Sequence, residues 1–475
     1  ELIYEHRTYL PSTFPIIAIS ALIVNVRPRL LSLITALTLV CLLCIGTYQR
    51  NKVWRSALSL WTDNIAKSPH DARVHLNLGE TLLDLGNTTR AATVLKRAIK
   101  LDPTLPNAYY GLAKSCRENR NYIQAIDYYQ QGLQRDPLNA TAYYNLGEVL
   151  QQMGKYQQAI VIYNKALDIN PNYPEVYNNL GAALQQTRDF GKAIAMFQQA
   201  LAIDPAYAGT YNNLGVVLAK TGRINEAIAM YQKALALDPK DPDVYNHLGL
   251  ALADTGKISE AIAMYQKALM INPQHASTCN NLGLALAGQG QPLKAISLYQ
   301  KALSADPNYI EAYVNLGMTL IHLNQPHKAI PYLLQALQKD PNIKEIHTNL
   351  AIAYAQTGQL RRAINHCHQA LTISPGCVAS MYNLGLIYQE QGTLKKAIEW
   401  LSKAIAGTPD NVQMRLSLAE VLAADGNRRL AIAQLKTVLT LDPGNMQALM
   451  VLGTLKKKKK DEPNAIRIYN QLSRL

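Results

Sequence analysis

The sequence is poor in charge and in phenylalanine, and it lacks the short motifs that mark most enzyme active sites. Only 17% of the 475 residues are charged, and 3 phenylalanines stand beside 27 tyrosines. There is no glycine-rich phosphate loop, no zinc-ligand spacing and no motif that supports a catalytic triad. His366-Cys367-His368 does not form a metal motif, because side chains two residues apart on a helix point to nearly opposite faces. We therefore predict no catalytic residues, no metal site and no cofactor in this chain.

Cysteines and basic residues do not form a functional pattern either. The 6 cysteines show no paired spacing, so they neither predict disulfides nor decide the redox compartment. The formal net charge is +14, but the basic residues do not gather with exposed aromatic residues as they do in nucleic-acid-binding proteins. We expect no nucleic-acid partner. The run Lys456–Lys460 fits a solvated end of the last repeat, with anionic lipid or nucleic acid as the alternative ligand.

The sequence is dominated by a repeat of 34 residues. At this interval a proline recurs from Pro69 to Pro443, a leucine from Leu78 to Leu452 and an alanine from Ala91 to Ala465. A period of this length is typical of solenoids, in which each repeat is one supersecondary unit that packs on its neighbours.

The clearest copy of the repeat predicts two helices joined by a turn. Apolar residues fall at helical spacing over residues 208–220 and again over residues 224–237. Gly222 lies between the two segments as a helix stop, and Pro239 ends the second segment. Most tyrosines occupy the packing positions of such helices, so we interpret them as core and not as a base-stacking surface.

This length and this pattern of small and aromatic residues resemble the tetratricopeptide repeat (TPR). The resemblance implies an all-α fold, a superhelical solenoid of about 12 repeats over residues 72–475 with the last repeat truncated. Residues 50–71 keep the register of a second helix without its first, and we predict a half-repeat there that joins the solenoid to the segment before it.

Two apolar runs precede the repeats. Residues 9–26 and 30–48 contain no charged residue and are separated by Arg27-Pro28-Arg29. The second run has about the length that a bilayer requires. We predict a transmembrane hairpin over residues 9–49, which follows an extramembrane loop at residues 1–8. A buried helical pair is the alternative for the first run.

One position of the predicted first helices repeats an amide. Asparagine precedes the recurring leucine in eight repeats, at Asn77, Asn145, Asn179, Asn213, Asn281, Asn315, Asn349 and Asn383. Asparagine is a poor helix former, and its amide offers both a donor and an acceptor. We predict that these residues bind the backbone of an extended peptide in a concave groove. A second set of asparagines is expected to extend this polar strip, at Asn178, Asn212, Asn246 and Asn280.

The row resembles the asparagine ladder in the TPR superhelix of O-GlcNAc transferase, where such residues hold protein substrates. The alternative is that repeat duplication copied an asparagine with no function. Chaperone-binding TPR domains use a clamp of lysines and arginines on their first helices. The matching positions here show no such cluster, so we do not expect a chaperone adaptor.

The N-terminal segment gives a further resemblance. Residues 5–12 read Glu-His-Arg-Thr-Tyr-Leu-Pro-Ser, and Trp54 stands just ahead of the repeats. This arrangement is similar to the end of the membrane domain in transmembrane and TPR-containing O-mannosyltransferases and their bacterial relatives. The resemblance implies a lipid-phosphate-linked sugar in a longer parent protein, with catalytic carboxylates upstream of Glu1. Arg7 would then pair with a lipid phosphate and Glu5 would orient it, with interfacial anchoring as the alternative.

These observations lead to one prediction of function and two alternatives. We predict the protein-binding TPR scaffold of a membrane-anchored glycosyltransferase, which presents protein substrates or partners to an active site outside this piece of the protein. The resembled family places the repeats on the extracytoplasmic side, whereas the count of basic residues favours the cytoplasmic face. The first alternative is a non-enzymatic, membrane-tethered TPR scaffold for complex assembly. The second is a superhelix that serves a soluble O-GlcNAc-transferase-like enzyme, against which the predicted hairpin argues.

Overall fold

The computed structural model describes residues 54–457, together with scattered positions between residues 34 and 48. Each described element is an α-helix, and this part of the chain contains no β-strand. The chain divides into two compact units, residues 1–217 and 218–475. The prediction of an all-α TPR solenoid is confirmed.

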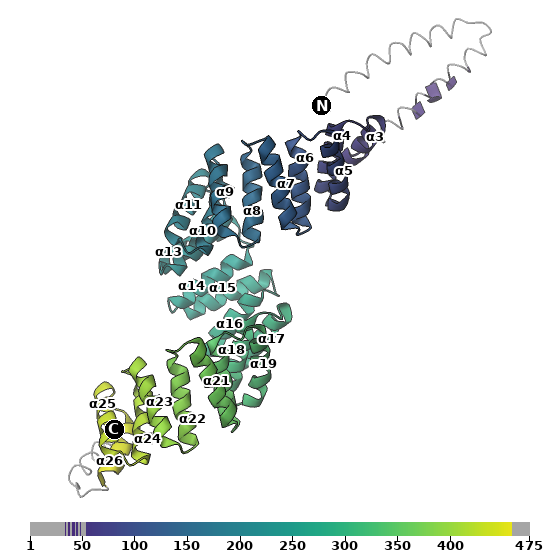
Figure 1. Ribbon diagram of the computed structural model, residues 1–475. Coiled ribbons are helices and arrows are strands. Elements are labelled where there is room, and N and C mark those ends of the chain that lie inside the picture. Colours follow the sequence, from purple (N-terminus) through teal and green to yellow (C-terminus); the bar gives the residue numbers. More distant parts are fainter. Residues whose placement is uncertain are drawn as a thin grey trace. The chain divides into compact units, whose positions relative to one another are not determined.

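Each repeat supplies two antiparallel helices, which we call its A helix and its B helix (Figure 1). The A helices are α4 (Ala72–Asp84), α6 (Pro106–Glu118), α8 (Ala140–Gln152), α10 (Pro174–Gln186), α12 (Ala208–Lys220), α14 (Pro242–Asp254), α16 (Ala276–Gly288), α18 (Ile310–His322), α20 (Lys344–Gln356), α22 (Val378–Glu390), α24 (Val412–Ala424) and α26 (Met446–Lys457). The B helices are α3 (Ala57–Lys67), α5 (Thr88–Leu101), α7 (Tyr122–Arg135), α9 (Tyr156–Ile169), α11 (Phe190–Ile203), α13 (Ile224–Leu237), α15 (Ile258–Ile271), α17 (Pro292–Ala305), α19 (Pro326–Lys339), α21 (Leu360–Ile373), α23 (Leu394–Gly407) and α25 (Arg428–Leu441).

The A helices line the inner face of each unit. Within a unit, an A helix packs on its own B helix, and that B helix packs on the next A helix. Neighbouring A helices also contact each other, as α4 and α6 do in the first unit and α18 and α20 do in the second. Among the described helices, no two neighbouring B helices make a comparable contact. The A helices are therefore the more closely spaced set, and their free faces form the concave surface of each unit.

The turn between the two helices follows the pattern expected from sequence. Helices α12 and α13 have the predicted bounds, and Gly222 between them takes a φ of +80°. A left-handed conformation costs glycine little, because it has no Cβ. Arg188 takes the same place one repeat earlier with a φ of +63°, so the turn persists where glycine is replaced.

Close packing between the A and B helices of a repeat forms the core. In the repeat of α10 and α11, the Ala193, Phe197 and Ala200 side chains are fully buried. A Cβ built on Gly181 would lie 2.7 Å from Cε1 of Phe197, which is closer than carbon atoms pack. The missing side chain of Gly181 is thus what allows the Phe197 ring to fill the space between the two helices.

The predicted membrane segment is not described by the structure. No helix among the described residues is long and apolar enough to cross a membrane. Most of the predicted hairpin, residues 9–49, lies outside the described residues, and so do Glu5 and Arg7. Those assignments remain predictions.

The packing at Gly181 can be tested with a matched pair of substitutions in one repeat. We expect Gly181→Ala to lower the free energy of unfolding by about 1–3 kcal/mol, because the new methyl group overpacks the core against Phe197. Gly191→Ala is the control, since Gly191 lies on α11 and no atom is within 4 Å of the place that an alanine methyl group would take. It should leave stability unchanged or raise it by up to about 1 kcal/mol. Urea denaturation followed by circular dichroism would measure both, and equal midpoints would contradict the packing account.

Candidate peptide-binding groove

The eight asparagines predicted as a peptide-binding ladder all lie on A helices. Each of them is half-buried, at one equivalent position per repeat on the concave side. Their hydrogen bonds nevertheless divide them into two groups of different character.

In the first group the amide holds two repeats together. The Asn213 Nδ2 donates to Oδ1 of Asn178 on the preceding A helix at 3.0 Å. The Thr210 hydroxyl donates to the same oxygen at 3.1 Å. Asn178 is only 7% exposed and Thr210 is fully buried, so this is an interior contact between α10 and α12.

The same contact recurs at a separation of 35 residues in both units. We call these contacts the inter-repeat seam, and its five pairs are Tyr144–Asn179 (3.2 Å), Asn178–Asn213 (3.0 Å), Asn246–Asn281 (3.0 Å), Asn280–Asn315 (2.9 Å) and Tyr382–Ser417 (3.0 Å). In each pair, a polar side chain one residue before the ladder position bonds the ladder residue of the next repeat. The expectation that Asn178, Asn246 and Asn280 extend an exposed polar strip is therefore wrong, because all three are buried.

In the second group the amide makes no hydrogen bond within the described part of the chain. Asn77, Asn145, Asn349 and Asn383, which we call the open asparagines, make no side-chain hydrogen bond to any residue that the structure describes. A half-buried amide without a protein partner retains its full capacity to bond a ligand.

The residue 35 positions earlier explains why these amides are open. For Asn349 that residue is Val314, which has no polar side chain. For Asn145 it is Tyr110, whose hydroxyl donates to the backbone carbonyl of Asp136 at 3.3 Å instead. Whether the seam hydrogen bond forms therefore depends on the side chain that the preceding repeat offers and on where that side chain bonds.

One open asparagine, Asn145, lines a cavity. This cavity of about 640 Å³ lies in the first unit, where α4, α6, α7 and α8 meet. We call it the N-terminal cavity, and it is lined by Glu80, Leu83, Asp84, Asn107, Tyr110, Gly111, Lys114, Arg117, Tyr129, Asn139, Thr141, Ala142 and Asn145.

Most charges at the N-terminal cavity are paired. Lys114 lies 3.8 Å from Asp84, and Arg117 forms an ion pair of 2.8 Å with Glu148 that is about three-quarters buried. The sequence pattern predicted no basic cluster on the A helices and did not single out Lys114 and Arg117. Each of these two cations already has a carboxylate partner. Glu80 is exposed at the rim, yet desolvation by the surrounding wall and the negative charge of Asp84 raise the pKa of its carboxyl.

The inner face of the second unit is more apolar. A second cavity, of about 430 Å³, is lined by Leu250, Tyr265, Asn281, Leu284 and others. Three residues after the ladder position, the A helices of the first unit begin with charged residues, at Glu80, Lys114 and Glu148. In the second unit this position is apolar in five A helices, at Leu250, Leu284, Met318, Ile352 and Leu386, and it is charged again at Glu420.

Comparison with known families agrees with this geometry. Three tetratricopeptide-repeat family models match residues 79–119, 286–342 and 342–410. The model of the Cilia and flagella-associated protein 70 C-terminal domain matches residues 105–291. The chain is a tetratricopeptide-repeat protein. As a TPR array with cavities and open amides on its inner face, it is a scaffold suited to protein binding.

Individual relatives of this TPR protein match in part. A protein O-mannosyl-transferase of Caenorhabditis elegans is 39% identical over 71 residues, which are 15% of this chain and 10% of that protein. The chain thus matches only about a tenth of that relative's length. Among solved structures, the APC/C hetero-tetramer Cut9-Hcn1 is 16% identical with a TM-score of 0.49, and the match covers 86% of this chain and 94% of that one. The TPR protein YrrB, whose structure is described as having an unusual peptide-binding site, is 26% identical with a TM-score of 0.35, over 41% of this chain and 97% of its own.

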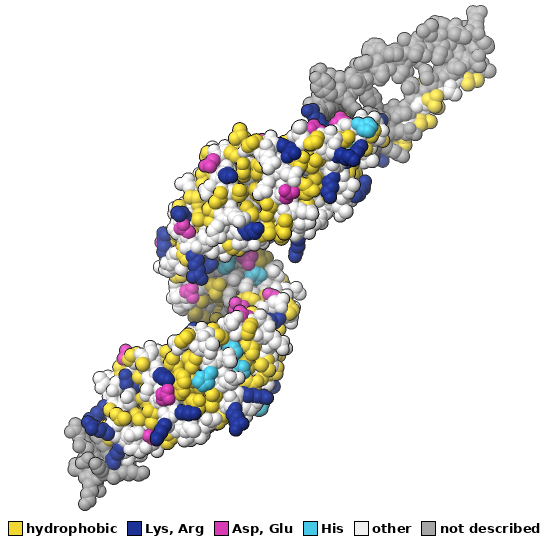
Figure 2. Space-filling view, viewed as in Figure 1, with side chains coloured by type: hydrophobic (Ala, Val, Ile, Leu, Met, Phe, Trp, Pro, Cys, Tyr) yellow, Lys and Arg dark blue, Asp and Glu magenta, His cyan; other side chains and the backbone are white. Residues whose placement is uncertain are grey.

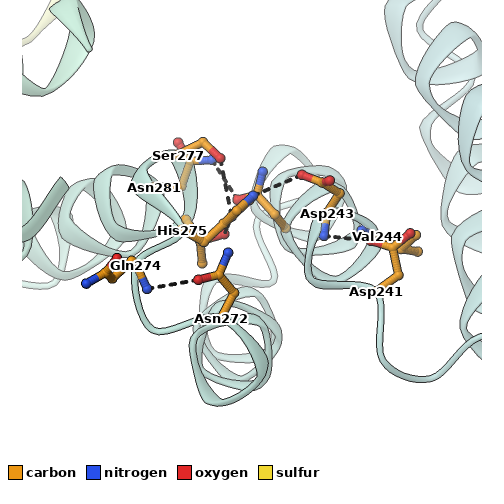
Figure 3. Close-up of polar contacts among 10 residues, drawn as sticks. Asp241, Asp243, Val244, Asn272, Gln274, His275, Ser277 and Asn281 are labelled. Carbon is orange, nitrogen blue, oxygen red and sulfur yellow. Dashed lines mark hydrogen bonds and ion pairs between the residues drawn. The ribbon is translucent and has the colours of Figure 1, made fainter. Parts of the chain in front are cut away.

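The Asp243, His275 and Thr278 side chains in the second unit form a chain of contacts like that of a catalytic triad, but they connect two repeats (Figure 3). The His275 Nε2 lies 2.9 Å from Oδ1 of Asp243 on the preceding repeat, and its Nδ1 lies 2.5 Å from the Thr278 hydroxyl. His275 is the N-cap residue of α16, and Thr278 is fully buried. The Thr278 hydroxyl is thus inaccessible to a substrate, and His275 instead joins two consecutive repeats of the second unit.

Two other histidines form a buried pair between α20 and α21. The His347 Nε2 lies 3.1 Å from the Pro341 carbonyl, which only accepts, so this nitrogen carries the proton. The His347 Nδ1 then accepts from Nδ1 of His366 at 3.0 Å. Burial, and secondarily the charge of His347, lower the pKa of His366 to about 4. His368 faces Trp400 instead, and no group of three metal-binding side chains exists among the described residues.

The seam predicts a stability difference between buried and open asparagines. We expect Asn178→Ala to lower the free energy of unfolding by about 1–3 kcal/mol, because it leaves the Thr210 and Asn213 donors without their acceptor. Asn77→Ala should change it by less than about 0.5 kcal/mol, since its amide bonds no described residue. Urea denaturation of the two variants distinguishes them, and equal losses would show that the seam contributes no stability.

The histidine pair predicts a pH dependence of stability. The folded pKa of His366 is about 4 and its unfolded value is 6.5, so the unfolded chain binds more protons between these values. Stability should fall as pH decreases through this window, by up to about 3 kcal/mol. Other repeats carry methionine at the position of His366, among them those of Met230 and Met264. The variant His366→Met should therefore fold and should show a smaller dependence of stability on pH. The exposed control His327→Gln should keep it. Urea midpoints at pH 7 and pH 5 measure the effect, and an unchanged slope in His366→Met would contradict it.

Proposed function

We propose that this chain binds extended segments of partner proteins in its inner groove, as the scaffold of a membrane-anchored glycosyltransferase of the O-mannosyltransferase type. The array would hold a protein substrate for an active site that lies elsewhere in the parent protein. Residues 9–49 would form the membrane hairpin, with the repeats on the extracytoplasmic side. Glu5 and Arg7 would lie near the phosphate of a lipid-linked sugar.

The open asparagines are the observation that carries peptide binding. An extended peptide offers a carbonyl and an N–H at each residue, and an amide complements both with one side chain. Asn77 and Asn145 provide such amides in the first unit, and Asn349 and Asn383 provide them in the second. Side-chain-independent bonding of this kind suits a scaffold that takes many sequences.

The partial match to the O-mannosyl-transferase of Caenorhabditis elegans supports the glycosyltransferase half of the proposal. The 71 matched residues are 39% identical. The same match also fits a membrane-tethered scaffold without an enzyme. An upstream reading frame with several further apolar spans and an acidic pair in an early loop would favour the enzyme, and a nearby start codon would favour the scaffold.

Peptide binding is tested by removing the open amides together. Peptides of 12 random residues, displayed on phage, are selected on the full chain, and the best ones are synthesised with a fluorophore. We expect a variant with Asn77, Asn145, Asn349 and Asn383 changed to Ala to bind them at least about tenfold more weakly by fluorescence anisotropy. The exposed B-helix asparagines Asn164 and Asn225, changed to Ala, are the control. Equal affinity of the fourfold variant and the control would exclude the open amides as the binding surface.

A further inference from the structure

Both cations that line the N-terminal cavity are paired with other carboxylates, which leaves the lining carboxylate of Glu80 without an ion pair among the described residues. Lys114 pairs with Asp84 and Arg117 pairs with Glu148, whose other oxygen accepts from the Tyr144 hydroxyl at 2.9 Å. Glu80 makes no ion pair or hydrogen bond with any residue that the structure describes. On the face shown in Figure 2, charged side chains of both signs are scattered among apolar ones.

We propose that the N-terminal cavity binds a lysine or arginine side chain of the partner polypeptide, with Glu80 as the counter-charge and Asn145 bonding the adjacent peptide backbone. This assignment rests on the proposed peptide-binding function and names the side chain that this site selects. The repeat pattern does not require a carboxylate at the position of Glu80, because the equivalent position is acidic in only some repeats.

The size and walls of the cavity suit a long basic side chain. Its volume of about 640 Å³ falls within the range of ligand pockets, about 300–1,000 Å³. Tyr110 lies half-buried in the wall, with its ring centroid 6.4 Å from that of the buried Tyr129 and 29° between the two ring planes. An accessible aromatic ring such as that of Tyr110 packs against the alkyl stem of lysine or arginine and attracts its cation.

An acidic partner side chain fits the same cavity poorly. At Arg117 it would have to displace the carboxylate of Glu148, an ion pair of 2.8 Å that is about three-quarters buried on both sides, and at Lys114 it would meet the negative charges of Asp84 and Glu80. Separating a pair of this kind leaves a poorly solvated charge behind. A basic side chain needs no such exchange, and it also offsets the desolvation and the repulsion from Asp84 that raise the pKa of Glu80.

The experiment compares the sequences that the full chain selects. Phage-displayed peptides of 12 random residues are selected on wild type, on Glu80→Gln and on Glu420→Gln, and the bound pools are sequenced. Glu420 is the matched control, because it holds the same repeat position in the second unit and already accepts a hydrogen bond of 2.7 Å from Gln447. Circular dichroism confirms that each variant is folded before selection.

We expect wild type and Glu420→Gln to enrich Lys or Arg at one peptide position, and Glu80→Gln to lose that enrichment. A selected peptide should bind Glu80→Gln about tenfold more weakly, as for the loss of one charge-assisted hydrogen bond. Capture of peptides without basic enrichment, or with the same enrichment in Glu80→Gln, overturns the cavity assignment and leaves peptide binding standing. Equal loss in Glu420→Gln also overturns it. Failure of the wild-type chain to capture any peptide overturns both the assignment and the proposed function.

Discussion

A buried hydrogen bond between consecutive A helices decides what the inner surface of this protein can do. In the inter-repeat seam, the ladder asparagine of one repeat donates to a polar side chain of the repeat before it, as Asn213 does to Asn178. Buried polar groups require such partners, since leaving one unsatisfied costs more than the bond contributes when formed. Where the seam forms, an asparagine that looks like a ligand contact is instead occupied in stacking the repeats.

The two roles of asparagine are separated by a single neighbouring residue. Val314 cannot accept a hydrogen bond, so Asn349 stays open, whereas Asn280 binds Asn315 in the repeat before it. The open amides thus occur where the seam is interrupted, with one pair in each unit. In the first unit, Asn145 lies at a cavity with an unpaired carboxylate, and in the second Asn349 and Asn383 are each followed three residues later by an apolar residue, Ile352 and Leu386. The two units therefore offer a partner different chemistry along one kind of groove.

Sequence alone predicted the repeat architecture well, because each level of it is periodic. The bounds of α12 and α13 follow from the spacing of apolar residues, from Gly222 and from Pro239. The site was predicted only in part. The eight asparagines lie on the inner face as expected, but their partition depends on pairs 35 residues apart, which a reading of single repeats does not compare. A comparison of each ladder position with the residue 35 positions earlier would have marked candidate seam pairs, but it would not have separated Tyr144–Asn179, which is bonded, from Tyr110 and Asn145, which are not. The N-terminal cavity could not be predicted, because it depends on how side chains from four helices pack.

The central claim is that the seam asparagines are structural and the open asparagines bind ligand. The most direct measurement is an experimental structure of the full chain with a selected peptide bound. The account predicts that the peptide backbone contacts the amides of Asn77 and Asn145, or of Asn349 and Asn383. The bonds of Asn213 to Asn178 and of Asn281 to Asn246 should remain in place. A peptide held by the amides of Asn213 and Asn281 with those bonds broken, or bound on the B helices, would contradict the account.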